Sequence, residues 1–104
     1  MKDKNLIKIV EYCKWIINKM NNIQSFDEFV NNEETVYSTF FLILQIAEYA
    51  KKLPNEIKET FSIDWKRLIG MRNVIVHDYD GIIQDTLYET LVYDIPILLE
   101  EISK

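Results

Sequence analysis

Glycine, proline, cysteine and histidine are all scarce in this 104-residue chain, and each scarcity narrows the possible folds. Two glycines leave little material for the tight turns of β-hairpins, so the chain favours helices. The single cysteine, Cys13, excludes an internal disulfide, suits a reducing compartment and is expected to pack as an apolar side chain. One histidine without clustered carboxylates makes a poor metal site, so we expect no metal and no other cofactor.

Long apolar runs are also absent. No stretch approaches the roughly 20 residues needed to span a bilayer, and the N-terminus lacks a secretory pattern, so we expect a cytoplasmic protein with no membrane contact. The 48% hydrophobic content indicates a compact globular protein, and the length fits one domain over residues 1–104. The net charge of −5 argues against general nucleic-acid binding. A protein of this charge that acts on RNA must therefore concentrate its positive charge locally.

Apolar residues recur at helical spacing along most of the chain. The spacing predicts helices over about 5–20, 33–53, 64–77 and 84–102, with short helices after Ser25 and Pro54. Asp64 is expected to cap the third long helix, and Pro96 is expected to kink the last one. No segment alternates well enough to be a strand. The sequence therefore predicts an all-α, single-domain bundle of four to five helices.

Two of these helices have more apolar surface than a small bundle can cover. The helix over 33–53 is apolar around most of its circumference, and residues 74–76 extend apolar character around the helix over 64–77. Part of this surface is therefore expected to meet a second copy of the chain, giving a homodimer.

Arg72 falls in the middle of the apolar face of its helix, where a guanidinium is costly unless it is paired or reaches an opening. A structural ion pair is one explanation, with Glu48 of the preceding long helix as the possible partner. The other is phosphate binding, to which the planar guanidinium is well suited. From the arginine alone the structural explanation is favoured.

His77, the only histidine, has the one side chain whose ordinary pKa lets it exchange protons near neutrality. It follows Arg72 by five residues, so on an ideal helix the two point about 140° apart. They can converge if the helix ends just before His77 or if two chains pack these helices together. Asn73 shares the face of His77 and could orient the imidazole or bind a ribose or phosphate oxygen. The plainer explanation for His77 is a cap at a helix C-terminus.

The order Arg72-Asn73-x-x-x-His77-x-Tyr79 resembles the R-x4-H-x-Y motif of HEPN domains of the HepT type. Gln45-Ile46-Ala47-Glu48 resembles the Q-I-x-E segment of that family's second long helix, and residues 63–73 resemble its approach to the motif. Residues 77–82 and Asp94-Ile95-Pro96 complete the pattern. The resemblance extends from about residue 39 to the C-terminus.

This resemblance implies a helical-bundle endoribonuclease that acts as a homodimer and cuts RNA without a metal, through attack of the ribose 2′-hydroxyl on the adjacent phosphate. His77 would act as general base or acid, Arg72 would bind and stabilise the phosphate, and Asn73 would position the substrate or His77. Lys66 and Arg67, one to two turns upstream, could supply local positive charge or could simply be a solvated helix start. The RNA class stays open, with tRNA and mRNA both possible.

The resemblance also implies a toxin–antitoxin system. The partner would be an MNT-type nucleotidyltransferase antitoxin that transfers AMP from ATP to Tyr79. The added phosphodiester would repel RNA and fill the cleft beside Arg72 and His77. An ordinary packed tyrosine is the plainer role for Tyr79, and the two are compatible. The alternative to the toxin is a non-catalytic helical module that binds a nucleotidyltransferase or a nucleotide.

Overall fold

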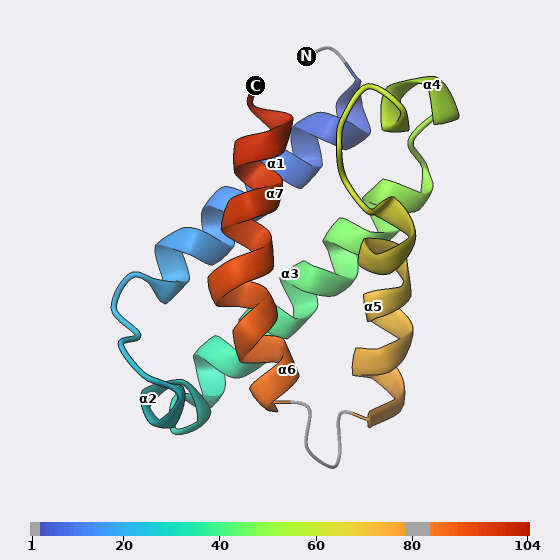
Figure 1. Cartoon of the computed structure of the whole chain (residues 1–104). Coiled ribbons are helices and arrows are strands. Elements are labelled where there is room, and N and C mark those ends of the chain that lie inside the picture. The colour runs from blue at the N-terminus through green and yellow to red at the C-terminus, as the bar shows by residue number, and fades with distance from the viewer. Residues whose placement is uncertain (1–2, 79–83) are drawn as a thin grey trace.

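The computed structural model of the chain describes residues 3–78 and 84–104, and for residues 74–78 it describes the backbone alone. Four long helical segments make up the bundle (Figure 1). They are α1 (Lys4–Met20), α3 (Glu33–Lys51), α5 (Trp65–Asp78) and a C-terminal segment of α6 (Gln84–Glu89), η1 (Thr90–Asp94) and α7 (Ile95–Ile102). Two short helices, α2 (Phe26–Val30) and α4 (Asn55–Lys58), join α1 to α3 and α3 to α5. The described residues contain no strand, and the prediction of an all-α bundle is confirmed.

Four helices, α1, α2, α3 and α5, begin at side chains that accept hydrogen bonds from otherwise unpaired backbone N–H groups. Ser25 accepts from the N–H of Glu28 at 3.2 Å, and Asp64 accepts from that of Arg67 at 3.0 Å, as predicted. Asp3 and Asn32 cap α1 and α3 in the same way. The carboxylate of Glu28 returns to the N–H of Gln24 at 2.9 Å, one residue before the position that a standard capping box uses. Local sequence therefore sets most helix starts.

The C-terminal segment passes through a π-helical turn over Thr90–Asp94, immediately before Pro96. Here the N–H of Ile95 bonds to the carbonyl of Thr90, five residues back. Because proline lacks the N–H of a regular helical bond, a widened turn ahead of it relieves the conflict without ending the helix. The irregularity expected near Pro96 is thus a π-helical turn in the structure, and the predicted kink itself stays a prediction.

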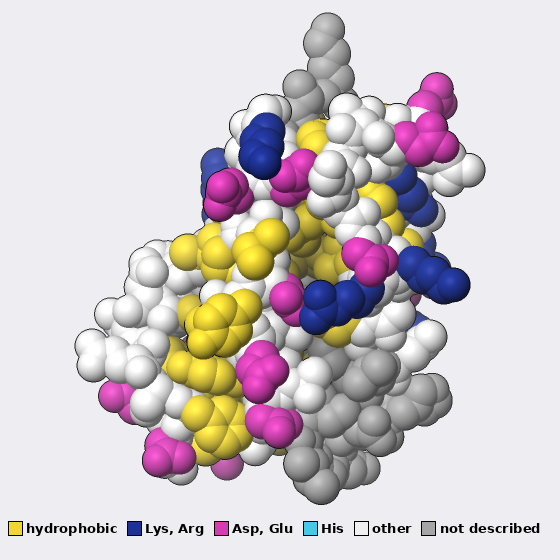
Figure 2. Space-filling view, in the orientation of Figure 1, with side chains coloured by type: hydrophobic (Ala, Val, Ile, Leu, Met, Phe, Trp, Pro, Cys, Tyr) yellow, Lys and Arg dark blue, Asp and Glu magenta, His cyan; other side chains and the backbone are white. Residues whose placement is uncertain are grey.

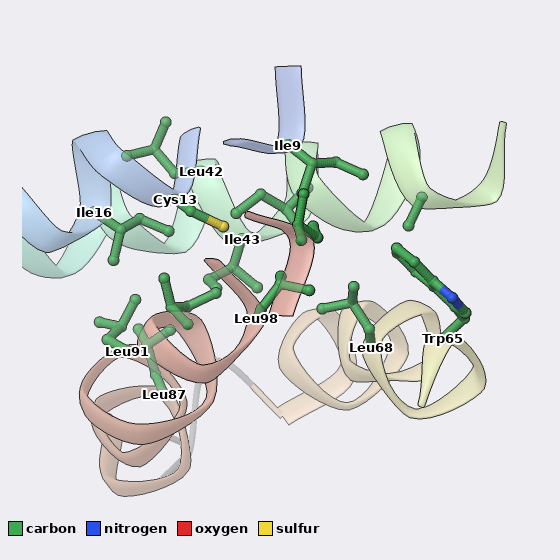
Figure 3. Close-up of a cluster of buried hydrophobic side chains, with 14 of the residues drawn as sticks. Ile9, Cys13, Ile16, Leu42, Ile43, Trp65, Leu68, Leu87, Leu91 and Leu98 are labelled. Carbon is green, nitrogen blue, oxygen red and sulfur yellow. The ribbon is translucent and has the colours of Figure 1, made fainter. Parts of the chain in front are cut away.

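α3 packs against both α1 and α5. The C-terminal segment packs against α1 (Figure 1). The buried side chains of these helices interdigitate in one core, shown in Figure 3, which includes Ile9, Cys13, Ile43, Leu91 and Leu98. α5 contributes Trp65 and Leu68, and the indole Nε1 of Trp65 donates to the carbonyl of Lys58 at 2.9 Å. One shared core explains why the four long segments behave as a single bundle.

No helix in the described part of the chain is long and apolar enough to cross a membrane.

Candidate functional site

Arg72 lies on the flank of α5 that faces α3, where its Nε is 3.2 Å from Oε1 of Glu48. The Arg72 side chain is 39% exposed and that of Glu48 37%, so the pair lies at the surface rather than in the core. The position of Arg72 along the helix predicted correctly that its side chain lies on the face toward the bundle, but it predicted a more buried side chain than the structure has. α3 and α5 diverge toward the C-terminal end of α5 (Figure 1), so Arg72 has less of α3 against it than Trp65 and Leu68 have.

Glu48 also pairs with Lys51 of its own helix, at 3.4 Å. One carboxylate therefore holds two cations, and Arg72 engages it through Nε. Within the described residues this is the ion pair that the structure shows for Arg72, whose side chain remains 39% exposed. The pair and phosphate binding are thus compatible, because a guanidinium carries five N–H donors and this one is partly exposed to solvent.

Arg67 points away from this site. Its NH2 atom lies 3.3 Å from Oδ2 of Asp94, on the side of α5 that faces the C-terminal segment. A position five residues before Arg72 is about 140° around the helix, which accounts for the separation. Lys66 is exposed at the start of α5. The structure therefore brings Glu48 to Arg72 but does not bring Arg67 there.

Asn73 is exposed next to Arg72. His77 belongs to α5 by its backbone, while its side chain and the whole of Tyr79 lie outside the described residues. α5 continues to Asp78, so the helix does not end before His77. One of the two ways in which Arg72 and His77 could converge is therefore wrong, and the packing of two chains remains.

A cavity of about 210 Å³ opens between α5 and the C-terminal segment, on the face shown in Figure 2. Its lining is largely apolar, with Arg67, Asp94 and Glu101 among the polar residues. Glu101 accepts a hydrogen bond from the N–H of Ser62 at 3.1 Å, and Arg67 pairs with Asp94, so these groups fasten α5 and its approach to α7. The cavity is separate from Arg72, which does not line it.

Two further features bear on chemistry. Cys13 is fully buried and burial raises the pKa of its thiol to about 12, so this side chain packs as expected and is not a nucleophile near neutrality. Among the described residues, no three histidine, cysteine, aspartate or glutamate side chains gather closely enough to hold a metal ion.

α3 exposes large apolar side chains on the side away from its core face. Tyr37 is 56% exposed and Phe41, one turn later, 55%, while Leu44 in the following turn is half-buried. The sequence indicated that α3 has more apolar surface than one chain can cover, and these residues are the uncovered part. The same outer side of α3 carries Glu48 near its end.

Sequence reasoning missed a cluster of aromatic side chains between α1 and α3, formed by Tyr12, Trp15 and Tyr49. A signal was present: Lys8, Tyr12, Trp15 and Lys19 follow one another at spacings of three to four residues, which places them on one side of α1.

The model of the family described as Ribonuclease HepT-like matches residues 4–104. "Putative RNase MJ1216" of Methanocaldococcus jannaschii is 37% identical over 100 residues, covering 95% of this chain and 82% of that protein. "Probable ribonuclease HepT" of Thermococcus cleftensis is 29% identical over 80 residues, covering 76% of this chain and 73% of that protein. No solved structure gives a significant match. The match along almost the whole chain, on an all-α bundle, shows that the chain belongs to the ribonuclease HepT-like family.

Proposed function

We propose that this chain is a metal-independent endoribonuclease toxin whose catalytic residues are Arg72 and His77. The observation that carries the proposal is the guanidinium of Arg72 at the surface, with its Nε held by Glu48 and its side chain 39% exposed. A cation fixed in this way can stabilise a phosphate whose charge increases during the reaction, without reorganising as it does so. Membership of a ribonuclease family supports RNA as the substrate.

The reaction is a transesterification within the RNA. The ribose 2′-oxygen attacks the adjacent phosphorus, and His77 as general base takes the proton of the 2′-hydroxyl. The bond between phosphorus and the 5′-oxygen of the next nucleotide breaks, and that oxygen receives a proton from an imidazolium or from water. The products are a 2′,3′-cyclic phosphate and a 5′-hydroxyl. Arg72 neutralises the charge on the phosphoryl oxygens, and Asn73 positions the substrate or the imidazole.

The site is composite in this proposal, with two chains contributing. α5 is helical through Asp78, so Arg72 and His77 of one chain lie on different sides of their helix. A second copy packed with its α5 nearby would bring the His77 of one chain toward the Arg72 of the other. The exposed Tyr37 and Phe41 on α3 supply apolar surface for such contact, because exposed apolar groups of this size commonly mark an interface.

Regulation by an MNT-type nucleotidyltransferase antitoxin follows from the same motif. The Tyr79 hydroxyl would attack the α-phosphorus of ATP, accept AMP and release pyrophosphate. The new phosphodiester would place a negative charge two residues beyond His77, where it would repel the RNA backbone.

The competing function is a non-catalytic module that binds the nucleotidyltransferase. The observation that favours it is the contact of Arg72 with Glu48, because a structural ion pair requires only that contact.

The deciding experiment is RNA cleavage by the purified, unmodified chain with EDTA present throughout. Arg72→Ala and His77→Ala should each abolish cleavage. Arg67→Ala is the matched control, because it removes an arginine from the same helix whose guanidinium pairs with Asp94 instead. Cleavage that leaves 2′,3′-cyclic phosphate ends and is lost only in the first two variants supports the ribonuclease. No cleavage by a folded wild-type dimer favours the binding module.

A further inference from the structure

Three aromatic side chains and one lysine form a cluster on the outer surface where α1 meets α3. The ring of Tyr12 lies 5.0 Å from that of Trp15 and 5.6 Å from that of Tyr49, measured between centroids. Nζ of Lys52 lies 5.4 Å from the centroid of the Tyr49 ring. These four residues, Tyr12, Trp15, Tyr49 and Lys52, are called the aromatic cluster below.

Of the three rings in the aromatic cluster, Trp15 is exposed, while Tyr12 and Tyr49 are half-buried against the core. Trp15 remains 48% exposed, although a tryptophan usually buries most of its large apolar surface. The pKa of Tyr12 is raised, first because its hydroxyl hydrogen-bonds to Tyr49 and second because of burial, so the phenol is neutral at physiological pH. A fixed, uncharged aromatic surface therefore lies open beside a lysine.

Positive charge gathers around the aromatic cluster despite the acidic balance of the chain. α1 carries four lysines and one glutamate, and Lys8 and Lys19 lie on the same side of it as Tyr12 and Trp15. α3 ends in Lys51, followed by Lys52. By contrast, residues 84–104 carry five acidic side chains and one lysine. Lys8 pairs with Glu11 at 3.9 Å and Lys51 with Glu48 at 3.4 Å, so the excess of positive charge on α1 and the end of α3 comes from the remaining lysines, Lys19 and Lys52 among them.

The aromatic cluster is connected to the candidate site through α3. Tyr49 faces α1, while the preceding residue, Glu48, holds Arg72 of α5. Viewed down the axis of α3, Lys52 lies between the direction of Tyr49 and the direction of Glu48. Since packed helices lie roughly 8–10 Å apart, α1 and α5, which both pack against α3, are separated by no more than about two such spacings, a distance that a short stretch of single strand can span.

We propose that the aromatic cluster binds unpaired bases of RNA by stacking, while Lys52 and the lysines of α1 contact the phosphates. Single-stranded RNA is recognised in this way because every base has a face that stacks on an aromatic ring and every linkage carries a negative charge. The proposal rests on the proposed function for its consequence, which is to direct single-stranded RNA toward Arg72, but binding itself can be measured without cleavage.

The test uses fluorescence anisotropy of a labelled single-stranded RNA of mixed sequence, with EDTA and a His77→Ala background to prevent cleavage. Trp15→Ala should weaken binding at least about fivefold, since stacking of one base on an aromatic ring contributes on the order of 1–3 kcal/mol. Trp15→Phe should retain most of the affinity. Lys52→Ala should weaken binding and reduce the slope of log affinity against log salt by about 0.7.

The matched control is Tyr93→Ala, an exposed aromatic on the acidic C-terminal segment, which should leave affinity unchanged. A fully paired RNA hairpin should bind the Trp15→Ala variant as it binds the parent. Circular dichroism establishes that each variant is folded.

Three results separate the hypotheses. Unchanged affinity in both Trp15→Ala and Lys52→Ala overturns the inference, even if the wild type cleaves RNA through Arg72. A Trp15→Ala variant that becomes monomeric in sedimentation also overturns it, because the aromatic cluster would then be a protein interface. Weakened binding in a chain whose wild type never cleaves supports the inference and refutes the proposed function alone.

Discussion

Glu48→Gln is the substitution that best separates a structural ion pair from an anchored catalytic arginine. It keeps the size of the side chain and removes its charge. Both partners are more than one-third exposed, so solvent screens their attraction strongly. Exposed pairs of this kind contribute about 0–1 kcal/mol, and in a domain of this size 1 kcal/mol corresponds to roughly 4–8 °C in Tm. We therefore expect the free energy of unfolding to fall by less than about 1 kcal/mol.

The effect on cleavage should be much larger than the effect on stability. Without the carboxylate, the guanidinium of Arg72 loses the contact that fixes its Nε, and a phosphate must then order the side chain itself. A preorganised donor at a phosphoryl group is commonly worth tenfold or more in kcat, so we expect kcat to fall by about that factor. KM should not rise, because removing one negative charge beside Arg72 favours RNA binding.

Urea unfolding measures the first quantity, and steady-state cleavage of a labelled RNA measures the second. Lys51→Gln is the matched control: it removes the other partner of Glu48 while leaving the contact with Arg72 in place, and kcat should stay within about twofold of wild type. Two results would refute the reasoning. A loss of stability above about 3 kcal/mol would mean that the pair is a buried structural one. An unchanged kcat would mean that Glu48 does not position Arg72.

Three further substitutions or treatments have defined outcomes. Phe41→Glu should convert the proposed dimer to a folded monomer in analytical ultracentrifugation and abolish cleavage, whereas Ile97→Glu, on the exposed side of α7, should do neither. A dimeric Phe41→Glu variant would exclude this face as the interface. Burial raises the pKa of the Cys13 thiol from 9.0 to about 12, so Cys13 should resist alkylation in the native protein and react on unfolding. Because the folded state holds the thiol proton more tightly, the contribution of Cys13 to stability is present below about pH 9 and is lost as the pH rises toward 12. Trp65→Phe removes the hydrogen bond to Lys58 and part of a buried ring, so urea unfolding should show a loss of about 1–3 kcal/mol, and a loss near zero would contradict the packing described for α5.

The sequence was informative about the helices because their signals are local. Ser25 and Asp64 cap helices where predicted, and Pro54 separates α3 from α4, because each acts through backbone groups within a few residues. The position of the irregular turn before Pro96 could be predicted, but its π-helical form could not. A turn in which an N–H bonds to the carbonyl five residues back differs from a sharp kink by small shifts that packing decides. The predicted helix ends differ from those in the structure by one or two residues, also because packing decides where the last turn ends.

The candidate site was predictable as a set of residue types but not as an arrangement. The pairing of Arg72 with Glu48 follows from two charges placed oddly on two apolar helices, and the structure contains it. The exposure of that pair depends on how α5 crosses α3, which no property of either helix alone determines. The direction of Arg67 toward Asp94 depends on the C-terminal segment in the same way. The roles of Asn73, His77 and Tyr79 stay predictions.

The distribution of charge offers a physical reason for an acidic protein to act on RNA. The lysines lie on α1 and the end of α3, whereas five acidic residues lie on the C-terminal segment, so an approaching RNA would be attracted to one surface of the bundle and repelled by another. Attraction at one surface and repulsion at the other orient the RNA more sharply than a uniformly basic surface would. The attraction favours the correct orientation, and the repulsion disfavours the wrong ones. Under the two proposals above, the acidity of the chain is part of how RNA would be directed onto α3 and toward Arg72.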